Sequence, residues 1–505
     1  MSKYQKVFIV IFIVFNFFLS SWYVLHKDIF FFTDVARDFL IYEEIDEKKI
    51  IFIGPRSSTS GIFHGPLWPY LNYPAYLLGQ GNPLVVGWYW IFLTVVSVVS
   101  SFYIAKKLFD ENTAYLFALI LSLFLVFHTK SFFNPYGALF FMPAFFYCFV
   151  RYIETLKGKY LVFLILTGGI LVQFQMAIGI PMLFLALLYT TYLIIRKRKF
   201  FHFLFYSLIL IPLSTFILFD IRHQFLMFNS FLKYIGPGNR DPYYKTYLDL
   251  VLERIGFIWG AGLQIFRQDV ERFHTLLLFV VMSVLIYFQV KDNKYKASYL
   301  SFIYFYAGFF ILSIINKSGG LLLHYFLPLA PLTLLIFSSF ITSRFKKMFA
   351  VLFVIVYLIN IHSFRFYVEE ANVFIGKHED SWKFLKSMTD RIYEDGEEEF
   401  GYFVYSPDSY GYQTKYAMHY AEKTHPQNEK RNQKDRITYL VLAPDPKDNP
   451  FINSPWWIEN KFHITKKPIK EIKFENGFKI QKYKFSDEEI NIAPEKDIDP
   501  GIHFR

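Results

Sequence analysis

Residues 160–195 read YLVFLILTGGILVQFQMAIGIPMLFLALLYTTYLII, without a charged side chain. A helix crosses a bilayer with about 20 apolar residues, so this stretch predicts two membrane spans, 160–176 and 179–195, joined by a tight turn around Gly179-Ile180-Pro181. Similar apolar runs predict nine more spans, at 7–25, 84–105, 113–129, 137–153, 203–219, 274–290, 297–315, 325–342 and 348–362. We therefore expect an α-helical polytopic membrane protein with about 11 transmembrane helices.

Composition supports this expectation. The 505 residues are 54% hydrophobic, 21% aromatic and 19% charged, whereas soluble domains carry about 25% charged residues. These values exclude a disordered protein, a coiled coil and an ordinary soluble enzyme. The single cysteine, Cys148, excludes a disulfide framework and a cysteine-based metal site, and its apolar surroundings predict a buried side chain.

The charges divide the chain into two predicted domains. Residues 363–505 hold 22 basic and 25 acidic residues, a much higher density than the 31 and 17 found in residues 1–362. We expect a transmembrane domain over 1–362 and a small soluble α/β or α+β domain over 363–505. In the latter, the sequence predicts a helix over 380–393 and strands over 399–406, 436–443 and 478–485.

The distribution of basic residues predicts the topology. With the N-terminus in the cytoplasm, the cytoplasmic segments carry 17 basic and 4 acidic residues, and the outer loops before residue 363 carry 14 and 13. Cytoplasmic loops are enriched in Lys and Arg. We therefore expect a multi-pass protein of the cytoplasmic membrane with an extracytoplasmic C-terminal domain. The net charge of +11 then reflects topology, and no nucleic-acid partner is expected.

The first outer loop contains two acids four residues apart, Asp34 and Asp38, with Arg37 beside them. On a helix these three residues share one face. A carboxylate placed next to lipid and aromatic residues can act as a general base towards a hydroxyl group. The alternative is a solvated loop acid or an Asp that caps a helix.

Three further places in the outer loops carry candidate binding residues. Residues 54–67 surround Arg56 and His64 with Gly, Pro and hydroxyl residues, which suits a phosphate, although turn chemistry explains the Gly and Pro equally well. Arg222 follows a span and either binds or forms an interfacial ion pair with Asp220. His324 and Tyr325 precede the tenth span, where an interfacial Tyr is commonly an anchor.

Taken together and in this order, these motifs resemble the membrane-embedded GT-C glycosyltransferases, in particular bacterial members similar to the protein mannosyltransferase family (glycosyltransferase family 39). The resemblance also includes Asn134-Pro135 and covers about residues 1–362. It implies transfer of a sugar, with inversion, from a polyprenyl-phosphate donor to a hydroxyl acceptor at the outer face. It implies that Asp34 is the general base and that Asp38 orients the acceptor or helps to bind a cation. The residues that it implies for the substrate and the departing lipid phosphate are Arg37, Arg56, His64, Arg222, His324 and Tyr325.

Two positions depart from the family pattern. Many relatives have Asp-Glu where this chain has Asp34-Val35, so one metal-ligand type is missing, and a divalent cation stays an open cofactor. Phe174-Gln175 stands where similar sequences have a His. The expected partners are membrane lipid, the polyprenyl-phosphate sugar, and an acceptor that is a protein, a lipid or a glycan.

Two other functions remain open from the sequence. A transporter or flippase for lipid-linked sugars would need a charged path through the membrane, but the polar residues gather at one face. A polymerase or ligase that uses a diphosphate-linked oligosaccharide would place the same residue types in the same loops.

Overall fold

The computed structural model describes residues 1–235, 246–258, 272–315, 322–496 and 498. The chain folds into two compact units. The first comprises Met1–Ser21, Ile50–Asn72 and Tyr89–Tyr367. The second comprises Trp22–Lys49, Tyr73–Trp88 and Val368–Arg505.

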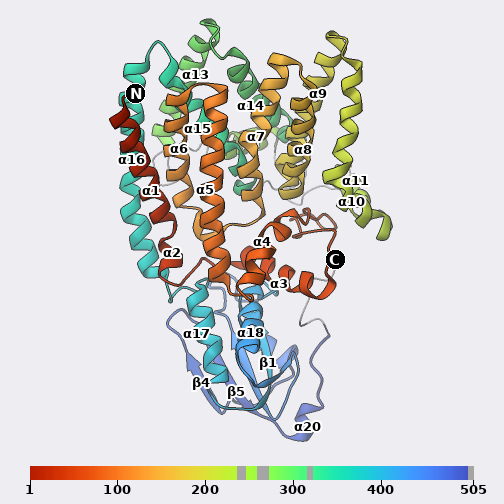
Figure 1. Ribbon diagram of the computed structural model, residues 1–505. Coiled ribbons are helices and arrows are strands. Elements are labelled where there is room, and N and C mark those ends of the chain that lie inside the picture. The colour runs from red at the N-terminus through yellow and green to blue at the C-terminus, as the bar shows by residue number, and fades with distance from the viewer. Residues whose placement is uncertain (236–245, 259–271, 316–321, 497, 499–505) are drawn as a thin grey trace. The chain divides into compact units, whose positions relative to one another are not determined.

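Long apolar helices make up most of the first unit, where neighbours such as α7 and α8 or α1 and α6 pack side by side (Figure 1). The helices that correspond to predicted spans are α1 (Lys3–Ser20), α5 (Pro83–Leu108), α6 (Glu111–Val126), α7 (Asn134–Thr155), α8 (Gly158–Phe174), α9 (Met176–Arg196), η2 with α10 (Phe200–Ile209, Leu210–Arg222), α13 (Arg272–Lys291), α14 (Lys296–Ile315), α15 with its flanking turns η5 and η6 (Ala330–Ser339, Leu327–Leu329, Phe340–Thr342) and α16 (Lys346–Phe374). Shorter elements connect them, namely α4 (Leu67–Leu78), η1 (Thr129–Ser131), α11 (Leu226–Ile235), α12 (Tyr247–Phe257) and η4 (Leu323–Tyr325).

These helices confirm the predicted membrane fold. Within the described residues, seven are long and apolar enough to cross a membrane, and four shorter apolar helices coincide with the remaining predicted spans. Each predicted span therefore has a helical counterpart. Cys148 is buried in α7, as expected.

The tight turn between the fifth and sixth spans lies elsewhere than predicted. Helix α8 ends at Phe174 and α9 begins at Met176, so the chain reverses at Gln175, whose backbone is extended (φ −151°, ψ 100°). Pro181 lies inside α9. The sequence had predicted the turn around Gly179 and Pro181. Gly179 instead permits close packing, because a Cβ there would lie 2.4 Å from the backbone nitrogen of Val172 on α8.

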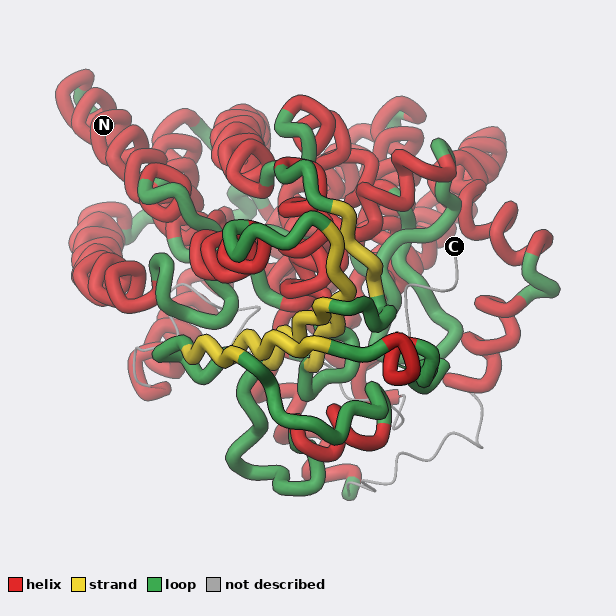
Figure 2. Tube along the Cα trace, turned by 90° about the horizontal axis from the view of Figure 1, so that it is seen from below, coloured by secondary structure: helices red, strands yellow, loops and turns green. Residues whose placement is uncertain are grey.

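The second unit is built on a mixed five-stranded sheet, drawn in yellow in Figure 2. Its strands are β1 (Glu399–Tyr405), β2 (Asn428–Arg431), β3 (Ile437–Leu442), β4 (Lys470–Lys473) and β5 (Lys479–Lys484), in the order β2-β1-β3-β5-β4. Strand β1 is parallel to β2 and β3, and β5 is antiparallel to β3 and β4. The three predicted strands match β1, β3 and β5; β2 and β4 were not predicted.

Alternating residues of the strands build a core on each face of the sheet. On one face, Phe403 and Tyr405 pack with Leu440 and with residues that follow the short helix α19 (Ser454–Asn460). On the other, Phe400 contacts the ring of Tyr393 at the end of helix α17 (Trp382–Tyr393), and α17 packs on α18 (Tyr412–Thr424). A last short helix, α20 (Asp487–Ile490), follows β5.

Helix α3 (Thr33–Lys48), from the first predicted outer loop, also belongs to this unit. It packs on α18 and follows the short helix α2 (Trp22–Leu25). The fully buried Asp28 fixes the approach to it: its carboxylate accepts hydrogen bonds from the Ser381 hydroxyl (2.5 Å) and from the backbone nitrogens of Gly376 (3.1 Å) and Lys383 (3.0 Å). The start of α3 is therefore anchored to the residues that open α17.

Candidate functional site

The two predicted acids lie in the first two turns of α3, as the spacing requires. Arg37 links them: its Nη1 donates to Asp34 Oδ1 at 2.6 Å, and its Nη2 donates to Asp38 Oδ1 at 3.1 Å. The Asp38 side chain is only 2% exposed, whereas that of Asp34 is 36% exposed. Of the two carboxylates, Asp34 is thus the one that a substrate can reach.

Arg37 is the electrostatic centre of this group. Burial of its guanidinium lowers its pKa, but the charges of Asp34 and Asp38 outweigh that effect and raise the pKa overall. An arginine that donates to two carboxylates in this way fixes their separation. The arrangement can therefore hold one buried and one accessible carboxylate next to each other.

A third acid lies beside the start of α3, and the sequence did not point to it. The amide of Gln413 donates to the hydroxyl of Thr33 and to Asp380 Oδ1, both at 3.1 Å. The backbone nitrogen of Phe31 donates to the carbonyl of Asp380 at 2.7 Å. These contacts bring the beginning of α17 and of α18 to the residues before Asp34.

Asp380 belongs to a His-Glu-Asp sequence, His378-Glu379-Asp380, whose ligand atoms lie within 4.8 Å of one another. In the described part of the chain, this is the group of three or more such side chains close enough to share a metal ion. Burial, and then the charge of Asp380, raises the pKa of Glu379; burial also raises the pKa of Asp380. One imidazole and two carboxylates are a donor set that suits a divalent cation.

In the first unit, the loop with Arg56 and His64 forms a small hairpin. The backbone nitrogen of Gly54 donates to the carbonyl of His64, and the nitrogen of His64 donates to the carbonyl of Pro55, both at 2.8 Å. His64 is buried, while Arg56 is exposed. Gly65 is needed for close approach, because a Cβ there would lie 1.8 Å from the side chain of Gln173 on α8.

This hairpin contacts two other predicted site segments. The hydroxyl of Ser58 lies 3.0 Å from that of Tyr325, which is itself buried. Phe63 packs against Phe219 and Met227 at the junction of α10 and α11. The structure thus brings together, within the first unit, the hairpin, the residues before α15 and the end of α10.

The other candidates of the first unit divide into exposed and packed side chains. Arg222 is exposed at the end of α10. Asp220 accepts hydrogen bonds from the backbone nitrogens of Met227 (2.8 Å) and Phe228 (3.0 Å), so it caps α11. The ring of His324 packs edge-on against Phe133, 5.4 Å away. Asp220 is thus structural, and Arg222 is the accessible cation there.

The predicted site residues fall into both units. Asp34, Arg37 and Asp38 belong to the second unit, and Arg56, His64, Arg222, His324 and Tyr325 belong to the first. Within the second unit, Arg37 bonds to both acids, and within the first unit the segments that carry the other residues contact one another.

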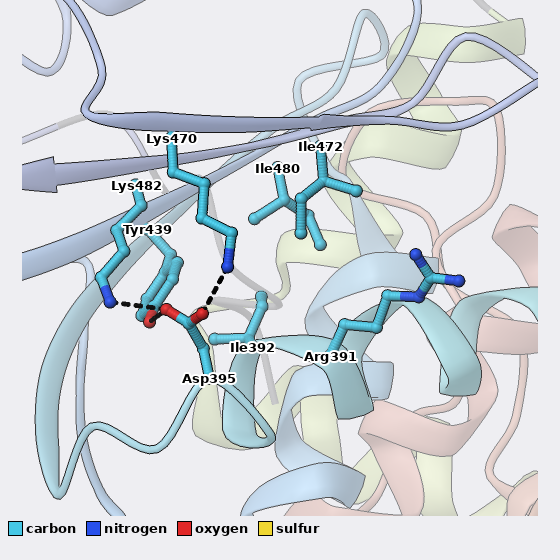
Figure 3. Close-up of a pocket in the computed structure, with 8 residues that line it drawn as sticks. All are labelled: Arg391, Ile392, Asp395, Tyr439, Lys470, Ile472, Ile480 and Lys482. Carbon is cyan, nitrogen blue, oxygen red and sulfur yellow. Dashed lines mark hydrogen bonds and ion pairs between the residues drawn. The ribbon is translucent and has the colours of Figure 1, made fainter.

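One other charged cluster in the second unit has a structural role. Figure 3 shows Lys470 and Lys482 directed at Asp395, with Nζ–Oδ distances of 2.6 and 2.5 Å, and Tyr439 donates to the same carboxylate at 2.8 Å. Burial raises the pKa of Asp395, but the hydrogen bonds from the two lysines outweigh it and lower that pKa. The adjoining cavity, about 10 Å³, has room for at most one water molecule. The cluster therefore ties α17 to the sheet.

The sequence of this chain resembles one known protein family. Residues 63–219 match the family model described as dolichyl-phosphate-mannose-protein mannosyltransferase. No curated protein sequence is similar enough to this chain to count as a relative.

Two solved structures share the fold over nearly the whole chain. ArnT from Cupriavidus metallidurans in the apo state is 11% identical, with a TM-score of 0.62 over 94% of this chain and 97% of that one. The same protein bound to undecaprenyl phosphate is also 11% identical, with a TM-score of 0.61 over 95% and 98%. The resemblance predicted from the sequence is confirmed: the chain has the fold of the GT-C membrane glycosyltransferases, and part of its membrane unit matches the dolichyl-phosphate-mannose-protein mannosyltransferase family.

Proposed function

We propose that the protein is a membrane glycosyltransferase that moves a sugar from a polyprenyl-phosphate donor to a hydroxyl acceptor at the outer face of the cytoplasmic membrane. The observation that carries the proposal is the acid pair at the start of α3, in which Arg37 holds a buried Asp38 next to an accessible Asp34. The family match and the fold support the transferase class.

In this mechanism Asp34 takes the proton of the acceptor hydroxyl while its oxygen attacks the anomeric carbon. The bond between that carbon and the phosphate oxygen breaks, and the polyprenyl phosphate leaves with the electron pair, so the configuration inverts. A positioned base contributes roughly 10²–10⁴-fold to such a rate. Arg37, which also donates to Asp38, holds Asp34 in place.

A leaving phosphate needs cations or other donors that are already in position. Arg56 and Arg222 are the exposed cations of the first unit's candidate segments, and His64, His324 and Tyr325 lie on the same segments. We assign these residues to the lipid phosphate. In the second unit, His378, Glu379 and Asp380 offer donors that would hold a divalent cation if the reaction uses one.

The test is donor turnover by the full chain in lipid. Wild-type protein is mixed with a panel of polyprenyl-phosphate sugars and membrane extract, and the release of free polyprenyl phosphate is measured. We expect release with one donor and a loss of at least 10²-fold in Asp34→Asn. Asp46→Asn, on the same helix and bonded to Tyr73, is the control and should keep the wild-type rate.

Three other results would each change the proposal. Normal turnover by Asp34→Asn would remove Asp34 from the mechanism. No release of polyprenyl phosphate by folded wild type, but consumption of a diphosphate-linked oligosaccharide, would favour the polymerase or ligase. Movement of an unconsumed donor across the bilayer would favour the flippase.

A further inference from the structure

The second unit contains a cleft of about 320 Å³ that the mechanism above does not use. It lies between α3, α18 and the strands β1 and β2, so four elements contribute to its walls. Pockets that bind small organic ligands start at about 300 Å³. The cleft is thus large enough for a small ligand and belongs to a single compact unit.

Charged side chains in the cleft are fixed by neighbours. Glu43 accepts from His419 (2.7 Å) and from Lys423 (2.9 Å). Burial raises the pKa of Glu43, but His419 and Lys423 outweigh it and lower that pKa. Glu44, largely buried, pairs with Lys48 at 2.8 Å. Their neighbours therefore fix both carboxylates in position, and carboxylate oxygens can accept further hydrogen bonds from a ligand.

The cleft is lined by equal numbers of acidic and basic side chains. The three carboxylates (Glu43, Glu44, Glu47) belong to α3, and of the three cations Lys48 belongs to α3, Lys415 to α18 and Arg431 to β2. Arg431 is itself ion-paired with Glu422 of α18. Because the charges balance, the cleft does not favour an anion such as a phosphate. A neutral ligand that both donates and accepts hydrogen bonds at many positions matches it better.

Two tyrosine rings add flat apolar surface to this polar lining. Tyr402 of β1 and Tyr412 of α18 both line the cleft. Tyr412 stacks on Tyr410 at a ring separation of 5.1 Å, which fixes its orientation. An aromatic face between hydrogen-bonding groups suits a sugar ring, which has an apolar C–H face and hydroxyl groups around its edge.

The cleft adjoins the acid pair. On α3, Leu40 and Glu44 line the cleft and follow Arg37 by three and seven residues, which places them on neighbouring positions of one helix face. Tyr412 lies close enough to Arg37 for its phenol to raise the pKa of that guanidinium. A ligand seated in the cleft would therefore lie beside the group that holds Asp34.

We infer that this cleft binds a neutral, hydroxyl-rich saccharide, and that this saccharide is the acceptor part of the substrate. The inference rests on the proposed function, because it takes Asp34 as the base that meets one hydroxyl of the bound sugar. It narrows the acceptor from protein, lipid or glycan to a molecule with an exposed sugar.

The test is saccharide binding by the full chain in lipid nanodiscs, followed by saturation-transfer NMR. The probes are maltose, mannobiose and N,N′-diacetylchitobiose, with an acidic tripeptide and inorganic phosphate as comparisons. We expect saturation of the ring protons of at least one disaccharide, and a decrease of about five-fold or more in Tyr412→Ala and in Lys415→Ala. Lys447→Ala, an exposed lysine outside the cleft, is the matched control and should bind like wild type.

Three outcomes overturn the inference. They are no binding of any disaccharide, binding that both cleft variants retain, and saturation of the tripeptide or competition by phosphate in place of the sugars. Donor turnover by wild type is measured in parallel. Turnover without sugar binding means that only this inference fails, whereas absent turnover from folded protein means that the proposed function fails.

Discussion

At the scale of single residues, Arg37 holds the acid pair of α3 together. Its one guanidinium serves two carboxylates, and its side chain is only 10% exposed. The sequence predicted this group because all three residues lie within one helical turn and its continuation, where spacing alone decides which side chains meet. Asp380 and Gln413 were not predicted, since they reach the start of α3 only through tertiary folding.

Replacement of Arg37 should therefore destabilise the second unit. In Arg37→Met the buried carboxylate of Asp38 loses its ion pair, which costs about 3–5 kcal/mol. Lys48→Met, which breaks the more exposed pair with Glu44 on the same helix, should cost less than about 1 kcal/mol. Both are measured by denaturant unfolding of the full chain in detergent. Equal losses in the two variants would contradict the central role of Arg37.

Gln175, at the turn between α8 and α9, gives a prediction of opposite sign. It is fully buried, and neither atom of its amide has a hydrogen-bond partner among the described residues. Gln175→Met should leave stability unchanged or raise it by about 1–3 kcal/mol, because a buried unpaired amide is costly. Gln173→Met, which removes bonds to Pro212 and Thr215, should lower it. Thermal unfolding compares the two, and a marked loss in Gln175→Met would show that its amide is paired.

At the scale of elements, the sequence predicted what hydrophobic pattern determines. Apolar runs located each of the apolar, membrane-type helices in the described part of the chain, and β-rich runs located β1, β3 and β5. It missed β2 and β4 because Asn-Glu-Lys-Arg and Lys-Glu-Ile-Lys have no apolar alternation. These short strands form only because the neighbouring strand offers free backbone groups.

Strand β2 carries a group that should make stability depend on pH. The Glu429 side chain is fully buried, 3.8 Å from Arg431 Nε, and neither carboxylate oxygen has a hydrogen-bond partner among the described residues. Burial raises its pKa to about 7. The unfolded chain loses this proton near pH 4.5 and the folded chain near pH 7, so the contribution of Glu429 to stability falls across that window and stays low above it.

Glu429→Gln should thus stabilise the protein by roughly 2 kcal/mol at pH 8 and by much less at pH 5. The measurement is the unfolding midpoint of the full chain at both pH values. Glu475 is exposed, so Glu475→Gln serves as the control: its effect on the unfolding midpoint should be the same at pH 5 and pH 8. A stabilisation in Glu429→Gln that is the same at pH 5 and pH 8 would contradict the raised pKa.

At the scale of the whole molecule, charge composition and tertiary packing divide the chain differently. The charge density predicted a boundary at 362/363, which stays a prediction. The compact second unit also includes residues 22–49 and 73–88, which are far in sequence from its C-terminal part, residues 368–505. Composition could not reveal this, because the contacts are aromatic: Phe31 and Phe39 pack on Tyr416, with ring separations of 5.6 and 5.0 Å.

A fragment of residues 368–505 should therefore not fold on its own. Without α3, the fully buried ring of Tyr416 and one face of α18 would be exposed to water. We expect poor dispersion of amide-proton NMR signals from this fragment. A version fused through a flexible linker to residues 22–49 should be better dispersed. A well-dispersed spectrum from the fragment alone would contradict this dependence.

The charged outer strands of the sheet have a consequence where many copies of the protein are crowded in one membrane. Strands β2 and β4 are the two edges, and between them they carry Glu and Lys or Arg at nearly every position. An edge strand with unpaired backbone groups is a template for strands of other chains, and charged side chains oppose such pairing. When many copies share one bilayer, each sheet therefore ends at its own borders and does not join its neighbours into a continuous ribbon.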